Sequence, residues 1–128
     1  MEALKIYITI TQTNEVVLED KSIRMILFDG ICKSDYFNGK VLSGGVDTQI
    51  VDTTGVGTLS ARYILKGYDG QQQPCSIFIE NNGVIGDGEI VTHPQIYTDS
   101  SNLKWLETKA LIGKVSFENE QLVVTIYA

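Results

Sequence analysis

The chain has 128 residues, 43% of them hydrophobic, and a formal net charge of −6. This length predicts a single domain, residues 1–128, that buries roughly two-thirds of the surface its unfolded chain exposes. The ten basic residues are scattered, whereas nucleic acids and anionic membranes bind clustered Lys and Arg, so we expect neither as a partner.

The N-terminal and cysteine patterns predict a cytoplasmic protein. No apolar run approaches the roughly 18 residues of a membrane span, and residues 1–5 lack the basic and apolar regions of a signal peptide. In a reducing compartment, Cys32 and Cys75 are expected to be free and buried. Two thiols cannot build a structural zinc site without help from the single histidine, His93. We therefore expect no metal and no cofactor.

Apolar residues alternate with polar ones along most of the chain, which predicts strands. The alternation is clearest in residues 4–11, and a second run, 23–32, contains Asp29-Gly30, a pair that suggests a bulge or bend. Asn38-Gly39 is a strong hairpin-turn signal ahead of a strand at 40–43. Further strands are expected at residues 46–51, 57–67, 75–81, 88–91, 108–117 and 122–127.

About nine strands with almost no helical periodicity predict an all-β fold. Closing the sheet removes edges that would pair with other chains, which favours a single closed or nearly closed antiparallel β-barrel of roughly 8–10 strands over an open sandwich. Residues 92–106 show no sustained alternation and predict one long irregular loop or a short helical turn. This stretch is expected to plug one end of the barrel with Trp105 and Leu106, to form a mobile lid, or to do both.

Polar side chains interrupt the predicted strands between residues 44 and 83. Asp47 and Gln49 are two residues apart and so share one face of their strand. Arg62 and Tyr63 are adjacent, so only one can point inward. If it is Tyr63, the buried hydroxyl needs a partner; if it is Arg62, the charge needs a carboxylate or an anionic ligand, and Asp47 is the obvious mate. The combination indicates a lined cavity. Asp69, which precedes a glycine, is explained by turn geometry alone.

The order of these residues is similar to that of a known family. The motif G-G-x-D-x-Q at 44–49 is followed by A-R-Y at 61–63, D-G at 69–70, N-G at 82–83 and W-L at 105–106. From about residue 23 to the C-terminus, the pattern resembles a family of small bacterial and fungal β-barrel proteins described only as domain of unknown function 3237. The resemblance implies a barrel with a lined interior, and it lends no activity.

The favoured hypothesis is a barrel that binds a small, mostly apolar molecule bearing a carbonyl, hydroxyl or carboxylate. The candidate ligand contacts, besides Asp47, are Gln49, Arg62, Tyr63, His93 and Trp105.

The alternative is a metal-free acid/base enzyme of the cyclase or isomerase type acting on a small carbonyl-containing substrate. Asp47 would transfer a proton while Tyr63 or Arg62 stabilises an oxyanion. The chain has no P-loop, dinucleotide fingerprint or G-x-S-x-G elbow, which disfavours nucleotide-driven and serine-hydrolase chemistry. Apolar residues on outer strand positions suggest, more weakly, a homo-oligomer.

Overall fold

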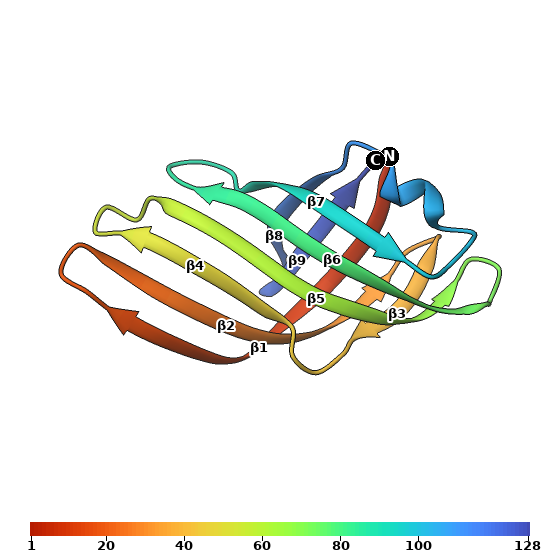
Figure 1. The fold of residues 1–128 in the computed structure, drawn as a ribbon, viewed down its shortest axis with the longest axis horizontal. Coiled ribbons are helices and arrows are strands. Elements are labelled where there is room, and N and C mark those ends of the chain that lie inside the picture. The colour runs from red at the N-terminus through yellow and green to blue at the C-terminus, as the bar shows by residue number, and fades with distance from the viewer.

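A computed structural model describes residues 1–128 as nine antiparallel β-strands and one short 3-10 helix, η1 (Figure 1). The predicted all-β barrel is therefore confirmed. None of the helical structure has the length and apolar character that crossing a membrane requires. The elements are β1 (Glu2–Val17), β2 (Lys21–Lys33), β3 (Phe37–Val41), β4 (Val46–Asp52), β5 (Gly57–Asp69), β6 (Pro74–Ile85), β7 (Val91–Thr98), η1 (Lys104–Glu107), β8 (Ile112–Glu118) and β9 (Gln121–Tyr127).

The strands form one sheet that closes on itself. β1 pairs with β2 on one side and with β9 on the other, and the order continues through β8, β7 and β6 to β5. β3 and β4 share the remaining place between β2 and β5, each pairing with a different half of these two strands. Closure is uneven, because β7 and β8 are joined by only two residue pairs, Val91–Lys114 and Thr92–Gly113.

The two ends of the barrel differ. We call the end beside η1 and the chain termini the closed end, and the end with the β1–β2, β4–β5 and β6–β7 turns the open end (Figure 1). At the open end the strands continue past the β8–β9 turn, so residues 9–17 of β1 have no partner on the β9 side. Inward-facing side chains pack the closed end into a dry core that includes Leu4, Ile6, Phe37, Leu65, Ile77, Ile79 and Ile96.

η1 and the residues before it plug the closed end. Leu103 and Leu106 are buried in the core, and Trp105 packs edge-on against Tyr36 with ring centroids 5.4 Å apart. Of the two sequence alternatives for this stretch, the structure has the plug, because its apolar side chains are already part of the core.

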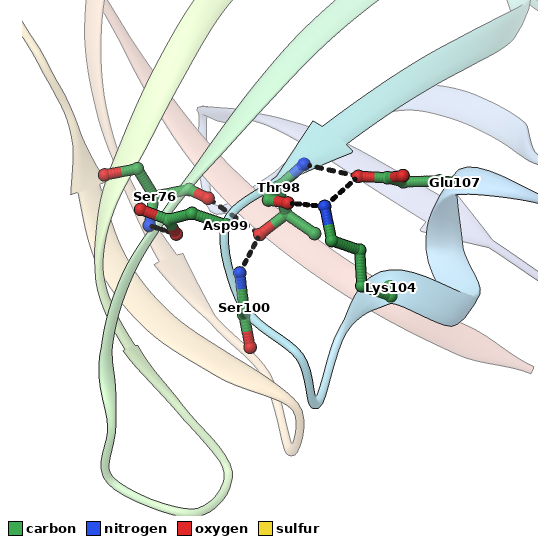
Figure 2. A network of polar contacts seen from close by, with 6 residues as sticks. All are labelled: Ser76, Thr98, Asp99, Ser100, Lys104 and Glu107. Atoms are coloured by element: carbon green, nitrogen blue, oxygen red, sulfur yellow. Dashed lines mark hydrogen bonds and ion pairs between the residues drawn. The ribbon is translucent and has the colours of Figure 1, made fainter.

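Polar contacts tie the plug to the sheet (Figure 2). The Glu107 carboxylate accepts a hydrogen bond from the Thr98 backbone N–H at 2.9 Å and pairs with Lys104 Nζ at 3.1 Å. These two donors lower the pKa of Glu107. The Thr98 hydroxyl donates to the Ser76 carbonyl at 2.7 Å and accepts from the Ser100 N–H at 3.1 Å. The polar side-chain groups of Thr98, Lys104 and Glu107 are therefore all hydrogen-bonded.

Asp69 does more at the closed end than shape its turn. Its Oδ1 accepts the backbone N–H groups of Gln71 and Gln73, as expected for a turn, but its Oδ2 accepts from Ser100 Oγ at 2.9 Å and Asn102 Nδ2 at 3.1 Å. Burial alone would raise the pKa of this carboxyl, and the four donors lower it overall. The turn-only interpretation is thus incomplete, since Asp69 also anchors the plug loop.

Two secondary-structure predictions are wrong, because local sequence signals compete with long-range strand pairing. Asn38-Gly39 lies inside β3 rather than in a turn; Gly39 lies so close to the β5 backbone that a Cβ would overlap the Lys66 carbonyl. Residues 88–90 are loop, and the strand is 91–98 instead, despite Pro94. Beyond Thr92, β7 has no partner on its β8 side, and such edge-like stretches tolerate a residue without an N–H.

Candidate functional site

A cavity of about 270 Å³ occupies the open-end half of the barrel. Ile10 and Phe117, exposed by 52% and 73%, lie at its mouth. Of the 16 lining residues 12 are hydrophobic, so the cavity favours an apolar body. The lining consists of Ile8, Ile10, Ile26, Phe28, Asp47, Gln49, Leu59, Ala61, Tyr63, Asn81, Ile90, Thr92, Val115, Phe117, Leu122 and Val124.

The polar lining residues come from four neighbouring strands of the barrel. β4 supplies Asp47 and Gln49, β5 supplies Tyr63, β6 supplies Asn81 and β7 supplies Thr92.

Strand register places them relative to one another. Asp47 pairs with Ala61, and Ala61 pairs with Asn81, so the acid and the amide lie in one row on either side of Ala61. Two strand spacings separate their backbones by roughly 10 Å. The small Ala61 side chain leaves room above it for a bound group to reach both. Near this row, Thr92 of β7 pairs with Gly113 of β8. A Cβ at Gly113 would overlap Thr92 Oγ1, so the glycine leaves room for the threonine hydroxyl.

Four polar atoms of the residues that line this cavity lack partners. Asp47 Oδ1, Tyr63 Oη, Asn81 Oδ1 and Thr92 Oγ1 are buried and make no hydrogen bond. In the whole chain only one other buried side-chain nitrogen or oxygen is unpartnered, Arg24 Nε. Because leaving such an atom unpaired costs about 1–3 kcal/mol, unpartnered atoms are normally few and dispersed. Their concentration in one cavity is the main chemical feature of this site.

Asp47 is held in an environment that disfavours its charge. Burial raises the pKa of this carboxyl, and the hydrogen bond from Gln49 Nε2 to Oδ2, at 2.9 Å, and the positive charge of Arg24 offset only part of the rise. Gln49 holds Oδ2 of the carboxyl and leaves Oδ1 buried without a partner. Asp47 can therefore hold or accept a proton closer to neutral pH than an ordinary aspartate.

Tyr63 is fixed by packing rather than by hydrogen bonds. Its ring contacts Phe28 edge-on with centroids 5.3 Å apart. Burial, with contributions from Cys32 and Asp47, raises the pKa of the phenol, so the hydroxyl is neutral and can donate or accept a hydrogen bond. The register in which Tyr63 points inward and Arg62 outward is the one observed.

Three sequence candidates lie away from the cavity. Arg62 is on the outer face, where its Nε lies 3.3 Å from Glu80 Oε2; the expected Asp47–Arg62 pair is not formed, because Arg62 is opposite Val46 on β4 and opposite Glu80 on β6. His93 is exposed on β7, next to the inward Thr92. Trp105 belongs to the closed-end plug. Asp47, Gln49 and Tyr63 are the candidates that the structure brings together.

Asn81 and Thr92 line the cavity but are not among the candidates that the sequence predicts. Asn81 continues the inward alternation of Ile77 and Ile79, and that periodicity was a usable signal. The sequence around Thr92 shows no sustained alternation, so nothing in it indicates a strand or an inward-pointing side chain.

Metal-binding and thiol groups are sparse. No cluster of three or more His, Cys, Asp or Glu side chains is suited to hold a metal ion. Cys32 and Cys75 are free and buried, as expected, and burial raises the pKa of Cys32 to about 12, so its thiol stays protonated.

Comparison with known proteins identifies the family. The family model for proteins of unknown function DUF3237 matches residues 3–91. A UPF0311 protein of Clostridium acetobutylicum is 33% identical over 119 residues, which cover 79% of this chain and 73% of that protein.

Solved structures share the fold. A protein of unknown function from Clostridium acetobutylicum superimposes with a TM-score of 0.82 at 28% identity, covering 98% of this chain and 93% of that one. A structure described as an enzyme from Penicillium herquei gives a TM-score of 0.71 at 16% identity, covering 99% and 92% of the two chains. The chain belongs to the DUF3237 family of proteins of unknown function.

Proposed function

We propose that the protein binds a small molecule with a mostly apolar body and at least one oxygen or nitrogen substituent in the barrel cavity. The observation that carries this proposal is that four residues lining one apolar cavity, Asp47, Tyr63, Asn81 and Thr92, each bury a side-chain oxygen without a hydrogen-bond partner. A ligand that supplies those partners recovers the free energy that the empty arrangement forgoes.

The volume of the cavity limits the size of the ligand. An engineered apolar cavity of about 150 Å³ holds benzene, and this one measures about 270 Å³. A molecule of roughly ten to fifteen non-hydrogen atoms fits that space.

Native mass spectrometry of protein purified from its own host tests the proposal, together with one cavity-filling variant. Ala61→Leu places bulk between Asp47 and Asn81 and should abolish the retained mass. Thr58→Leu places the same leucine side chain on the exposed face of the same strand and should keep the retained mass. A retained mass that is unchanged in Ala61→Leu would contradict binding in this cavity.

Acid/base catalysis by Asp47 is a second candidate. It is supported by the raised pKa of this buried carboxyl beside a neutral Tyr63 hydroxyl, a combination suited to proton transfer to or from a bound group. The likeness to a structure described as an enzyme concerns the fold alone. Arg62, on the outer face, has no part in this version.

The two candidates differ in what Asp47→Asn does to a ligand recovered from the host. If Asp47 transfers a proton, incubation with the wild type yields a product of changed mass or retention time and incubation with Asp47→Asn does not, although both bind. If the ligand returns unchanged from both proteins, the catalytic candidate is excluded for that compound and binding stands.

A further inference from the structure

Arg24 lies just beyond the cavity on the same inner face. Along β2, the alternate residues Ile26 and Phe28 line the cavity, and Arg24 is two residues further toward the open end. It sits opposite Gln49 of β4 and opposite Glu15 of β1. Asp47 lies two residues from Gln49 on β4, opposite Ile26, and the Arg24 charge offsets part of the rise in the pKa of its carboxyl.

The guanidinium is poorly satisfied. Arg24 Nε is buried and makes no hydrogen bond. Its acidic neighbour, Glu15, lies with Oε2 3.6 Å from Nε, beyond hydrogen-bond length, and the two side chains are 35% and 40% exposed. A half-exposed pair of this geometry contributes little and is easily exchanged. Arg24 is thus a cation at the edge of an apolar cavity with donors to spare.

We propose that Arg24 binds a carboxylate carried by the ligand whose apolar body fills the cavity. The inference rests on the proposed function and specifies its ligand as an amphipathic carboxylic acid. The planar guanidinium fork matches a carboxylate in two parallel hydrogen bonds, a match that Lys cannot make. No Lys or Arg lines the cavity itself, so the charged end of the ligand lies at the open end, nearest solvent, and its body points toward Ala61.

Glu15 and Asp47 are the acids that face this position. Glu15 belongs to the β1–β2 hairpin, and its exposed carboxylate turns to water when the ligand takes the guanidinium. Asp47 lies one row deeper, opposite Ile26, and meets the body of the ligand rather than its carboxylate. Arg24 therefore discriminates among ligands by charge, and the cavity discriminates by size.

Octanoate and 1-octanol test this assignment, because they share a chain length and differ in the carboxylate. Calorimetric titration of the intact chain at pH 7 should show octanoate binding at least about tenfold more tightly than 1-octanol. Arg24→Gln should weaken octanoate by about 10- to 100-fold and leave 1-octanol unchanged. Lys66→Gln, which removes one positive charge from the exposed face of β5, is the matched control and should change neither.

A second variant tests the same inference if Arg24→Gln does not fold. Glu15→Gln removes the competing carboxylate and should tighten octanoate binding about two- to fivefold without affecting 1-octanol. Equal affinity of the wild type for both probes, or an equal effect of Arg24→Gln on both, would overturn the role of Arg24 while leaving cavity binding intact. Failure of both probes to bind the wild type would overturn the inference, whereas the proposed function, whose ligand also partners the polar groups of the cavity, is tested separately by the retained mass.

Discussion

Thr92 and Thr98 lie on the same strand and the same inward face of β7, six residues apart, and both are buried. Thr98, at the closed end, has its hydroxyl bonded to Ser76 and Ser100, whereas Thr92, in the cavity, has an unpartnered hydroxyl. Asp69 and Asp47 repeat the contrast: the first accepts four hydrogen bonds, and the second keeps one oxygen free. Polar groups at the closed end are bonded within the fold, whereas those lining the cavity keep an oxygen without a partner.

The largest effect is expected for Asp69→Asn. The amide nitrogen meets two of the donors that now bond the carboxylate, so the plug loop loses its anchor, and the melting temperature should fall by about 10 °C at pH 7. Because the donors lower the folded-state pKa of Asp69, its stabilisation is present above the unfolded pKa and is lost as the pH falls through the folded value. The difference from wild type should shrink toward pH 2. A constant difference at all pH values would show that the charge is irrelevant.

Thr98→Val should lower the free energy of unfolding by about 1–3 kcal/mol, because the isosteric methyl leaves the Ser100 N–H without a partner and removes the shorter of the two hydrogen bonds to the Ser76 carbonyl. Urea denaturation measures the change. The midpoint should shift with little change in slope, since the surface exposed on unfolding is nearly the same.

Asp47→Asn should leave the melting temperature at pH 7 unchanged or slightly higher. Burial raises the folded-state pKa of Asp47, so the protonated carboxyl is tolerated below the unfolded pKa and ionisation destabilises the fold as the pH rises through the folded value. The variant never ionises, so its advantage should grow with pH, opposite in sign to the trend at Asp69. Thermal unfolding from pH 3 to pH 8 measures both trends. A marked loss of stability in Asp47→Asn would assign Asp47 to the fold.

The smallest effect is expected for Thr92→Val, because no partner is stranded when the Thr92 hydroxyl is removed. Urea denaturation should place the variant within about 0.5 kcal/mol of wild type, or above it. The comparison of the two threonines fails if Thr92→Val and Thr98→Val lose similar stability.

The sequence predicts the features that depend on side-chain alternation within a single strand. Alternation along residues 57–67 required Arg62 and Tyr63 to face opposite ways, and the spacing of Asp47 and Gln49 placed them on one face; both hold. The partner of Arg62 could not be predicted, because it depends on the register between β5 and β6, which brings Glu80 opposite. The strand containing Thr92 was obscured by Pro94, whose tolerance follows from the missing β8 partner. Arg24 and Glu15 meet only because β1 and β2 form a long hairpin.

The two-pair join between β7 and β8 has a consequence for local opening of the barrel wall. Most of the wall is held by long ladders, such as the β5–β6 ladder from Gly57–Ile85 to Tyr68–Pro74, but this seam ends after Thr92–Gly113. Local openings that break few pairings require less free energy than unfolding. We therefore expect the backbone amide protons of this seam to exchange with solvent faster than those of the β5–β6 ladder, which hydrogen exchange would measure.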